Sequence, residues 1–90
     1  MPTITVNRGE TSEIDLGKTN GMTITAIGGD ASVYIDYQLS GAYLSAIKGR
    51  AGYGNPFTVK VGQSKSVSKS DLESEHVRVG AKKANISVTY

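Results

Sequence analysis

Apolar and polar residues alternate in seven short segments of this 90-residue chain. In each segment every second side chain is apolar, and most of the side chains between them are polar. This period of two is typical of a β-strand that packs one face on a core and exposes the other face to water. The apolar positions are Ile4 and Val6; Ile14 and Leu16; Met22, Ile24 and Ala26; Val33, Ile35, Tyr37 and Leu39; Phe57, Val59 and Val61; Val77 and Val79; and Ile86 and Val88.

Groups of turn-forming residues separate many of these segments. They are Arg8-Gly9-Glu10, Asn20-Gly21, Gly28-Gly29-Asp30 and Gly80-Ala81-Lys82-Lys83. Such residues favour the tight turns that join antiparallel strands, so we expect short hairpins at these places. Strands with one polar face do not suit a buried parallel sheet. The sequence therefore predicts an all-β fold, a small antiparallel β-sandwich or barrel of about seven strands, with residues 1–90 as its single domain.

Two stretches do not follow the alternation. Residues 40–55 are rich in glycine, and we expect a long loop there with at most one ordered piece, which could serve as a contacting arm. Residues 63–75 are rich in Ser and Lys and then acidic, which predicts an exposed loop or an edge strand protected by charge.

Charge and cysteine content limit the possible partners. The chain has 10 basic and 8 acidic residues, a formal net charge of only +2, and it has no cysteine. We therefore expect no disulfide framework, no thiolate metal site and no strongly electrostatic binding of nucleic acid. The first residues show no basic region followed by an apolar stretch, and no 18 apolar residues run together, so we expect neither secretion nor membrane insertion.

The sequence contains no recognisable catalytic arrangement. His76 is the only histidine, and no Gly-x-Ser-x-Gly segment supplies a nucleophile to accompany it, so we expect it to face solvent or to pair across strands. Gly17-Lys18-Thr19 is similar to the end of a phosphate-binding loop, but Ser12 stands where that motif needs glycine. We predict a non-enzymatic protein without catalytic residues or a cofactor.

An acidic group at positions 71, 73 and 75 requires a separate interpretation. On an extended backbone, Asp71, Glu73 and Glu75 would point to one side and could hold a hard cation such as calcium. The glycine and the wider set of oxygen ligands of a calcium loop are missing. We therefore interpret the group as a solvated acidic edge and predict no metal site.

Segments near the two ends of the chain carry a family resemblance. The segments are ITVNRGET at 4–11, KTNG and MTITA within 18–26, HVRVGA at 76–81 and NISVTY at 85–90. In their short Thr-rich strands after an Arg-Gly turn they resemble small all-β virion structural proteins of tailed bacteriophages, some of which decorate or cement the capsid. The resemblance implies a structural protein that is made in the host cytoplasm, lies on the capsid exterior and binds the phage major capsid protein.

A small domain without cross-links gains stability by burying surface in an assembly. Self-association would cover its open sheet edges. We therefore expect a homo-oligomer, with a trimer favoured. Tyrosine offers a wide contact area and a polar tip, although partial burial in the protein's own core is an equal alternative for each one. The expected contact residues are Tyr34, Tyr43, Arg50, Tyr53 and Tyr90.

Two other functions remain open from the sequence. The first is a phage tail or fibre accessory module, and the second is an immunoglobulin-like adhesion or binding domain. The number of copies in a particle separates these possibilities. A decoration protein is present in hundreds, a tail part in a few or a few dozen, and a cellular domain is absent.

Overall fold

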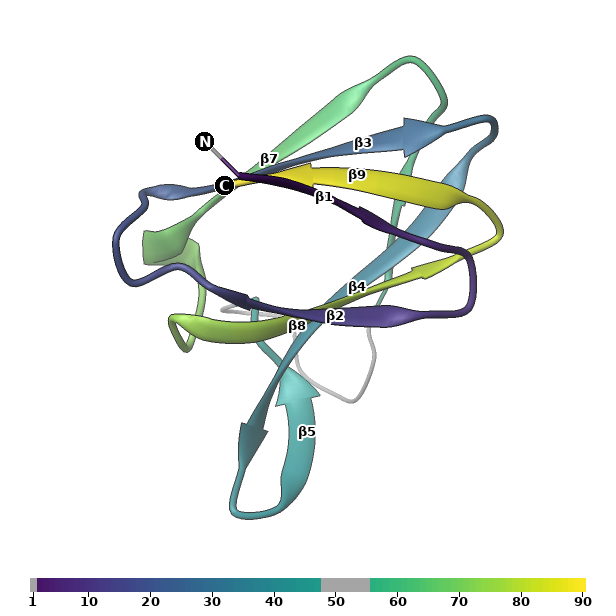
Figure 1. Ribbon diagram of the computed structural model, residues 1–90. Helices are drawn as coiled ribbons and strands as arrows, with labels where there is room; N and C mark the ends of the chain where they lie inside the picture. Colours follow the sequence, from purple (N-terminus) through teal and green to yellow (C-terminus); the bar gives the residue numbers. More distant parts are fainter. Residues whose placement is uncertain (1, 48–55) are drawn as a thin grey trace.

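The computed structural model describes residues 2–47 and 56–90 and consists of two antiparallel sheets packed face to face (Figure 1). This arrangement confirms the predicted all-β fold in its sandwich form, with nine described strands where about seven were expected. The described residues form β1 (Thr3–Val6), β2 (Thr11–Asp15), β3 (Gly21–Ile27), β4 (Ala31–Leu39), β5 (Ala42–Ser45), β6 (Phe57–Val59), β7 (Ser64–Ser68), the short 3₁₀ helix η1 (Lys69–Asp71), β8 (His76–Lys82) and β9 (Asn85–Thr89).

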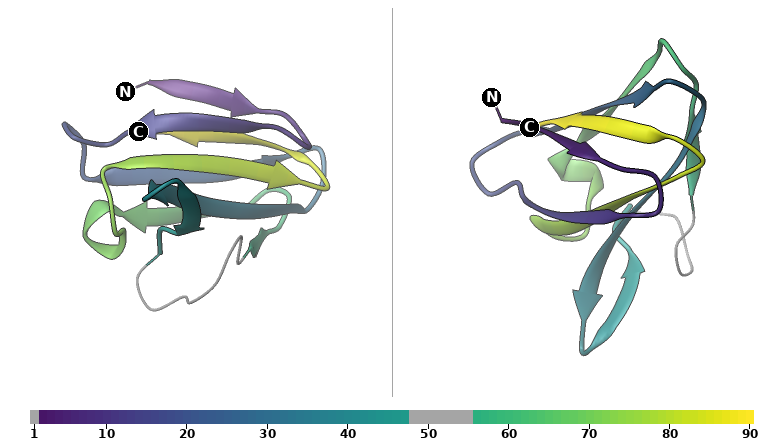
Figure 2. Two further views of the ribbon diagram at one scale, coloured as in Figure 1. Left: turned by 90° about the horizontal axis from the view of Figure 1, so that it is seen from below. Right: turned by 45° about the vertical axis from the view of Figure 1, so that its right-hand side comes forward.

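The strands divide between two layers, which Figure 2 shows from two further directions. The first sheet has the order β1-β9-β3-β7. The second sheet has the order β2-β8-β4-β5, and β6 pairs with β4 beside β5. All of these strand pairs are antiparallel, and both ends of the described chain lie on the first sheet.

The core lies between the layers and consists mainly of the apolar positions that the alternation predicts, joined by Val67, Leu72 and three alanines. Ile24 and Val88 of the first sheet and Val33 and Val79 of the second have no exposed surface, at 0% each. Burying apolar side chains stabilises the fold by roughly 1.5–3 kcal/mol for each large residue. Local periodicity therefore identifies the inward face of almost every strand.

Two apolar positions in the alternating pattern are exposed instead. Leu39 is 51% exposed because it lies in the β4–β5 hairpin, which extends beyond the body of the sandwich (Figure 1). Val61 is 53% exposed because β6 ends at Val59 and Val61 forms only an isolated bridge to Ala26. Neither side chain has an opposing sheet to cover it.

The prediction of short hairpins at the four turns is wrong. The turns from β1 to β2, β2 to β3, β3 to β4 and β8 to β9 all carry the chain from one sheet to the other. Among the described strands, only β4 and β5 are consecutive and paired. Turn chemistry reverses the direction of the chain, but it does not decide whether the next strand pairs with the last one or packs across from it.

The turn predicted at residues 80–83 also begins later than expected. Strand β8 continues to Lys82, and the left-handed backbone that makes the turn is at Lys83, whose φ is 74°. Gly80 is therefore a strand residue in the middle of the second sheet.

The two stretches without alternation both contribute a strand. Residues 42–45 form β5, so the expected loop at 40–55 is in part a hairpin, and residues 48–55 lie outside the described part of the chain. Residues 64–68 form β7 at the edge of the first sheet, which confirms the edge-strand alternative for this part of residues 63–75, whereas Lys69–Asp71 form η1.

Candidate interaction surface on the second sheet

The outer face of the second sheet carries a row of polar side chains that crosses four strands. Arg78 on β8 stands opposite Glu13 on β2 and opposite Asp36 on β4. Asp36 in turn stands opposite Ser45 on β5. Arg78 points away from the core because its neighbours Val77 and Val79 are buried. In the strand register Arg78 thus stands between two acidic residues.

Arg78 and Asp36 form a bidentate ion pair. Arg78 Nε donates to Asp36 Oδ1 at 2.9 Å, and Arg78 Nη2 donates to Asp36 Oδ2 at 2.8 Å. The aspartate side chain is only 2% exposed, whereas that of the arginine is 25% exposed. A buried carboxylate is tolerated when a cation and hydrogen bonds satisfy it, and two parallel hydrogen bonds fix the plane of the guanidinium.

The charge of Arg78 is stabilised in this position. The pKa of Arg78 is raised above its ordinary value by the hydrogen bond to Asp36, and further by the negative charge of that carboxylate, although desolvation lowers it. The guanidinium therefore remains a fixed cation on this face.

Asp36 binds the edge of the guanidinium, and the ring of Tyr43 covers one of its faces. Arg78 Cζ lies 3.6 Å from the centroid of the Tyr43 ring, a close cation–π stack. Tyr43 is on β5 opposite Gln38, so the β4–β5 hairpin brings it to Arg78. Asp36 and Tyr43 hold the same guanidinium from two strands, and we call these three residues with Tyr34 the Arg–Tyr surface.

Tyr34 reaches this surface because Gly80 leaves room for its ring. The two residues are opposite each other on β4 and β8, and a Cβ atom on Gly80 would overlap the phenol of Tyr34. Lys82 Nζ lies 5.7 Å from the centroid of the same ring. The glycine therefore allows an aromatic ring to lie across the β8 backbone.

A hollow of about 300 Å³ opens beside the Arg–Tyr surface. His76 is at this hollow, and its Nε2 atom is 3.5 Å from Oδ2 of Asp15 across the β2–β8 pair. The His76 side chain is 80% exposed, which confirms that it faces solvent and pairs across strands. The residues around the hollow are Glu13, Tyr37, Gln38, Tyr43, Ser74, His76, Val77 and Arg78.

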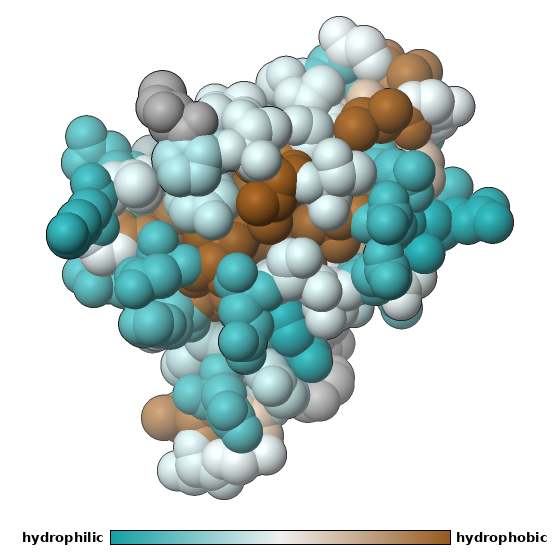
Figure 3. Space-filling view, in the orientation of Figure 1, coloured by the Kyte–Doolittle hydropathy of each residue, from teal (hydrophilic) through white to brown (hydrophobic). Residues whose placement is uncertain are grey.

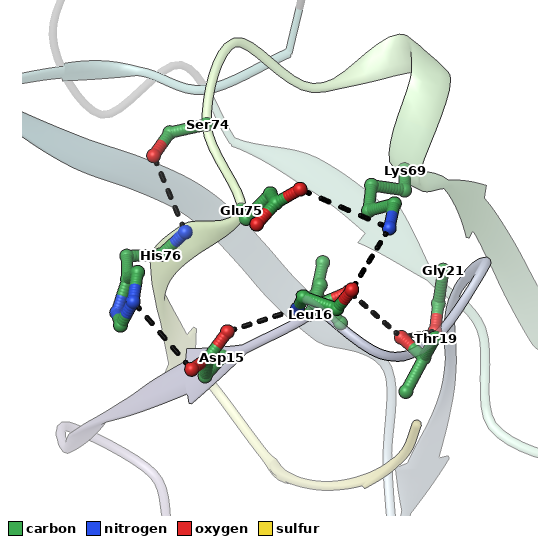
Figure 4. A network of polar contacts seen from close by, with 9 residues as sticks. Asp15, Leu16, Thr19, Gly21, Lys69, Ser74, Glu75 and His76 are labelled. Carbon is green, nitrogen blue, oxygen red and sulfur yellow. Dashed lines mark hydrogen bonds and ion pairs between the residues drawn. The ribbon is translucent and has the colours of Figure 1, made fainter.

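The acidic group at 71–75 does not form one extended edge. Asp71 belongs to η1, so the alternation that would align it with Glu73 and Glu75 is broken. Glu75 Oε1 instead lies 3.9 Å from Lys69 Nζ, which also donates to the Gly17 carbonyl at 3.4 Å (Figure 4). Within residues 2–47 and 56–90, no three His, Asp or Glu side chains gather where they could share a metal ion.

The expected contact residues do not form one site. Tyr34 and Tyr43 share the outer face of the second sheet. Tyr90 is half-buried at the end of the first sheet, where its N–H donates to the Pro2 carbonyl at 3.0 Å and its side chain lines hollows of about 520 and 590 Å³. Arg50 and Tyr53 lie outside the described residues.

Three residues of the Arg–Tyr surface and its surroundings are missed by sequence reasoning. Asp36 is an ordinary outward position of a strand in the pattern, and Arg78 is one of several basic residues in the second half of the chain. Gly80 is interpreted as a turn residue. The one signal in the sequence is that Asp36 lies in the middle of the longest alternating segment. Its partner Arg78 can be identified only from the strand register.

The comparisons with known proteins add no relative. No protein-family model matches the chain, and no curated protein or solved structure matches it significantly. In the part of the chain that the structure describes, no helix is long and apolar enough to cross a membrane.

Proposed function

We propose that this chain is a non-enzymatic structural protein that binds another protein through the Arg–Tyr surface. The observation that carries the proposal is the guanidinium of Arg78, which Asp36 holds at its edge and Tyr43 covers on a face. Arginine and tyrosine contribute disproportionately to binding energy in protein interfaces. Side chains that are already fixed lose little conformational entropy on binding, so this surface is preorganised for binding a partner.

The charges on this face favour a protein partner over nucleic acid. Asp36 neutralises Arg78, and the carboxyl groups of Glu13 and Asp15 project from the neighbouring strand β2. A phosphate backbone would meet these carboxylates as well as the cations, which opposes binding. A protein surface of mixed charge can complement both signs.

For the biological setting we propose the exterior of a phage head, with the major capsid protein as the partner. The support is the resemblance of the terminal segments to virion structural proteins of tailed phages. Repeated attachment to a lattice makes many small interfaces collectively strong. A tail or fibre accessory module and an immunoglobulin-like adhesion domain could use the same surface, and they are the alternatives.

Stoichiometric mass spectrometry of purified phage particles tests the setting. We expect hundreds of copies of the chain in each particle. A few or a few dozen copies would support the tail alternative instead, and particles that lack the chain would remove the virion role altogether.

A binding experiment tests the surface itself. Purified protein is added to heads that lack the chain, and co-sedimentation is measured for wild type and for the Tyr34→Ala/Tyr43→Ala variant. We expect roughly 10–100-fold weaker binding of the variant, as is common for interface tyrosines. The matched control is Thr23→Ala/Thr25→Ala on the outer face of the first sheet, which should bind like wild type. Equal binding of both variants would contradict the proposal.

A further inference from the structure

The outer strands of the sandwich differ in how their edges are protected. The first sheet ends with β1 and β7, and the second ends with β2 on one side and with β5 and β6 on the other. An unprotected edge strand offers free N–H and C=O groups to another strand, and proteins usually prevent such pairing with charged side chains. The edges of β2, β7 and β1 can be compared directly.

Two of these edges carry protecting charges. Lys65 on β7 stands opposite Ile24, on the core-facing side of the sheet, and yet it is exposed. A charge that points inward at an edge is a known device against pairing. Strand β2 carries Glu13 and Asp15, which would repel a second copy of the same strand.

Strand β1 has no such protection. Its sequence is Thr-Ile-Thr-Val, without a charge or a glycine, and no described strand pairs with its outer side. Ile4 is only half-buried against the core. Figure 3 shows a band of apolar surface between polar groups on the side of the molecule where the edges of β1 and β2 face the viewer.

The backbone of β1 also has free hydrogen-bonding groups at known positions. Tyr90 N–H donates to the Pro2 carbonyl, so Pro2 and Tyr90 are a hydrogen-bonded pair of the antiparallel ladder. Such pairs alternate along a ladder, so the N–H and C=O groups of Ile4 bond to β9. The N–H and C=O groups of Thr3 and Thr5 point away from the sheet, and no described strand lies there to pair with them.

We propose that the β1 edge pairs with the β1 edge of a second copy of this chain, antiparallel and around a two-fold axis. Thr3 stands opposite Thr5 of the second copy, and the four outward N–H and C=O groups of each strand are satisfied. Ile4 stands opposite Ile4 of the second copy at a non-hydrogen-bonded position, where the Cα atoms are about 4.5 Å apart. The two first sheets then become one continuous sheet, and the half-buried Ile4 side chains cover each other.

A two-fold dimer uses the β1 edge better than a closed trimer does. A closed ring joins two different surfaces of each copy, so a ring that continued the first sheet from copy to copy would pair β1 with β7. Lys65 opposes that contact, because its ammonium would be buried beside the apolar side chains of the next copy. An isologous pair uses only β1, which carries no charge to repel its own copy. We therefore propose a dimer in place of the trimer expected from the sequence, independently of the proposed function.

Single cysteine variants test the register, because the chain has no cysteine of its own. We expect Ile4→Cys to form a covalent dimer under mild oxidation, since Cα atoms at a β1–β1 axis are within the range of a disulfide. Glu13→Cys on the β2 edge is the matched control and should remain mostly monomeric on denaturing gels. Equally fast cross-linking of both variants would overturn the proposal.

Sedimentation of the unmodified protein tests the assembly. A short edge predicts weak association, so we expect the mass to rise with concentration from 9.5 kDa toward twice that value. Thr5→Pro removes an outward N–H and leaves the bonds to β9 intact, so it should shift the dimer dissociation constant at least 10-fold while the thermal transition is retained. Glu13→Pro should leave the dimer unchanged.

A second variant covers the case in which Thr5→Pro does not fold. Ile4→Lys places on β1 the inward charge that β7 already carries, and it should also abolish the dimer. A wild type that stays monomeric at millimolar concentration, a mass of three chains, or a dimer that survives in the folded edge variants would each overturn the proposal.

Discussion

The two outer faces of this sandwich differ in the kind of side chain that they present and in how those side chains interact. The face of the first sheet is a nearly uniform array of hydroxyl groups, whereas the face of the second sheet is organised around one ion pair. Across β1, β9, β3 and β7 the hydroxyl rows are Thr3–Thr89–Thr23–Ser66 and Thr5–Ser87–Thr25–Ser64.

The difference lies in how much each side chain depends on its neighbours. In the hydroxyl array, the Oγ1 atoms of Thr3 and Thr89 are 3.1 Å apart, and Thr25 Oγ1 is 2.8 Å from Ser64 Oγ. Both hydrogen bonds are exposed to water. An exposed hydrogen bond exchanges readily for one to water, so its loss costs little. On the second sheet, Asp36 is buried and cannot exchange its partner for water. Single substitutions should therefore cost little folding stability on the outer face of the first sheet and much more on that of the second.

The largest effect is expected for Arg78→Ala. This change leaves the Asp36 carboxylate, which is 2% exposed, without its cation. Breaking a fully buried pair costs about 3–5 kcal/mol, and we expect about 2–3 kcal/mol here because Arg78 is partly exposed. Urea unfolding at neutral pH measures the loss. A change below the scatter of replicate unfolding curves would show that the second face is as tolerant as the first.

Gly80→Ala should have the next largest effect. The new methyl group would overlap the Tyr34 ring, which must move, at a cost of about 1–3 kcal/mol. In a Tyr34→Ala background the same change should be neutral or stabilising, because alanine is less costly than glycine within a strand. Thermal unfolding of the four proteins gives the coupling. The control is Gly29→Ala, whose Cβ would be 3.7 Å from Ala84 Cβ, an ordinary contact.

Tyr43→Leu should have a smaller effect. Leucine keeps the apolar contact but removes the cation–π stack on Arg78, which is worth about 0.5–1 kcal/mol at a partly exposed site. A double-mutant cycle with Arg78→Ala, which removes the cation, isolates the pairwise energy. A coupling energy near zero would mean that Tyr43 does not contribute to holding the guanidinium.

The smallest effect is expected on the hydroxyl face. Thr23→Val keeps the branched shape that suits a strand and replaces an outward hydroxyl, so the free energy of unfolding should change by less than about 0.5 kcal/mol. Chemical unfolding of this variant beside Arg78→Ala gives the comparison directly. A loss as large as that of Arg78→Ala would mean that the hydroxyl rows are also a coupled network.

The sequence predicted parts of the candidate surface and missed its centre. Tyr34 and Tyr43 were expected to be contact residues, and the structure places them on one face because β4, β5 and β8 are neighbours. Arg78 and Asp36 are 42 positions apart, and each looks like a solvated outward residue of its own strand. Only the pairing of β4 with β8 puts them in register, and that pairing also makes Gly80 the residue beneath Tyr34.

The amino-acid sequence by itself determined where seven of the described strands form and which side of each of these is buried. The reason is that side-chain alternation is a local property of an extended backbone. The tertiary structure alone decided which strands are neighbours. The segments at Thr3–Val6 and Asn85–Thr89 have nearly the same composition as β3, so local preference cannot rank their possible partners. Packing of all the apolar faces at once selects the order, and that order creates both the ion pair and the open edge of β1.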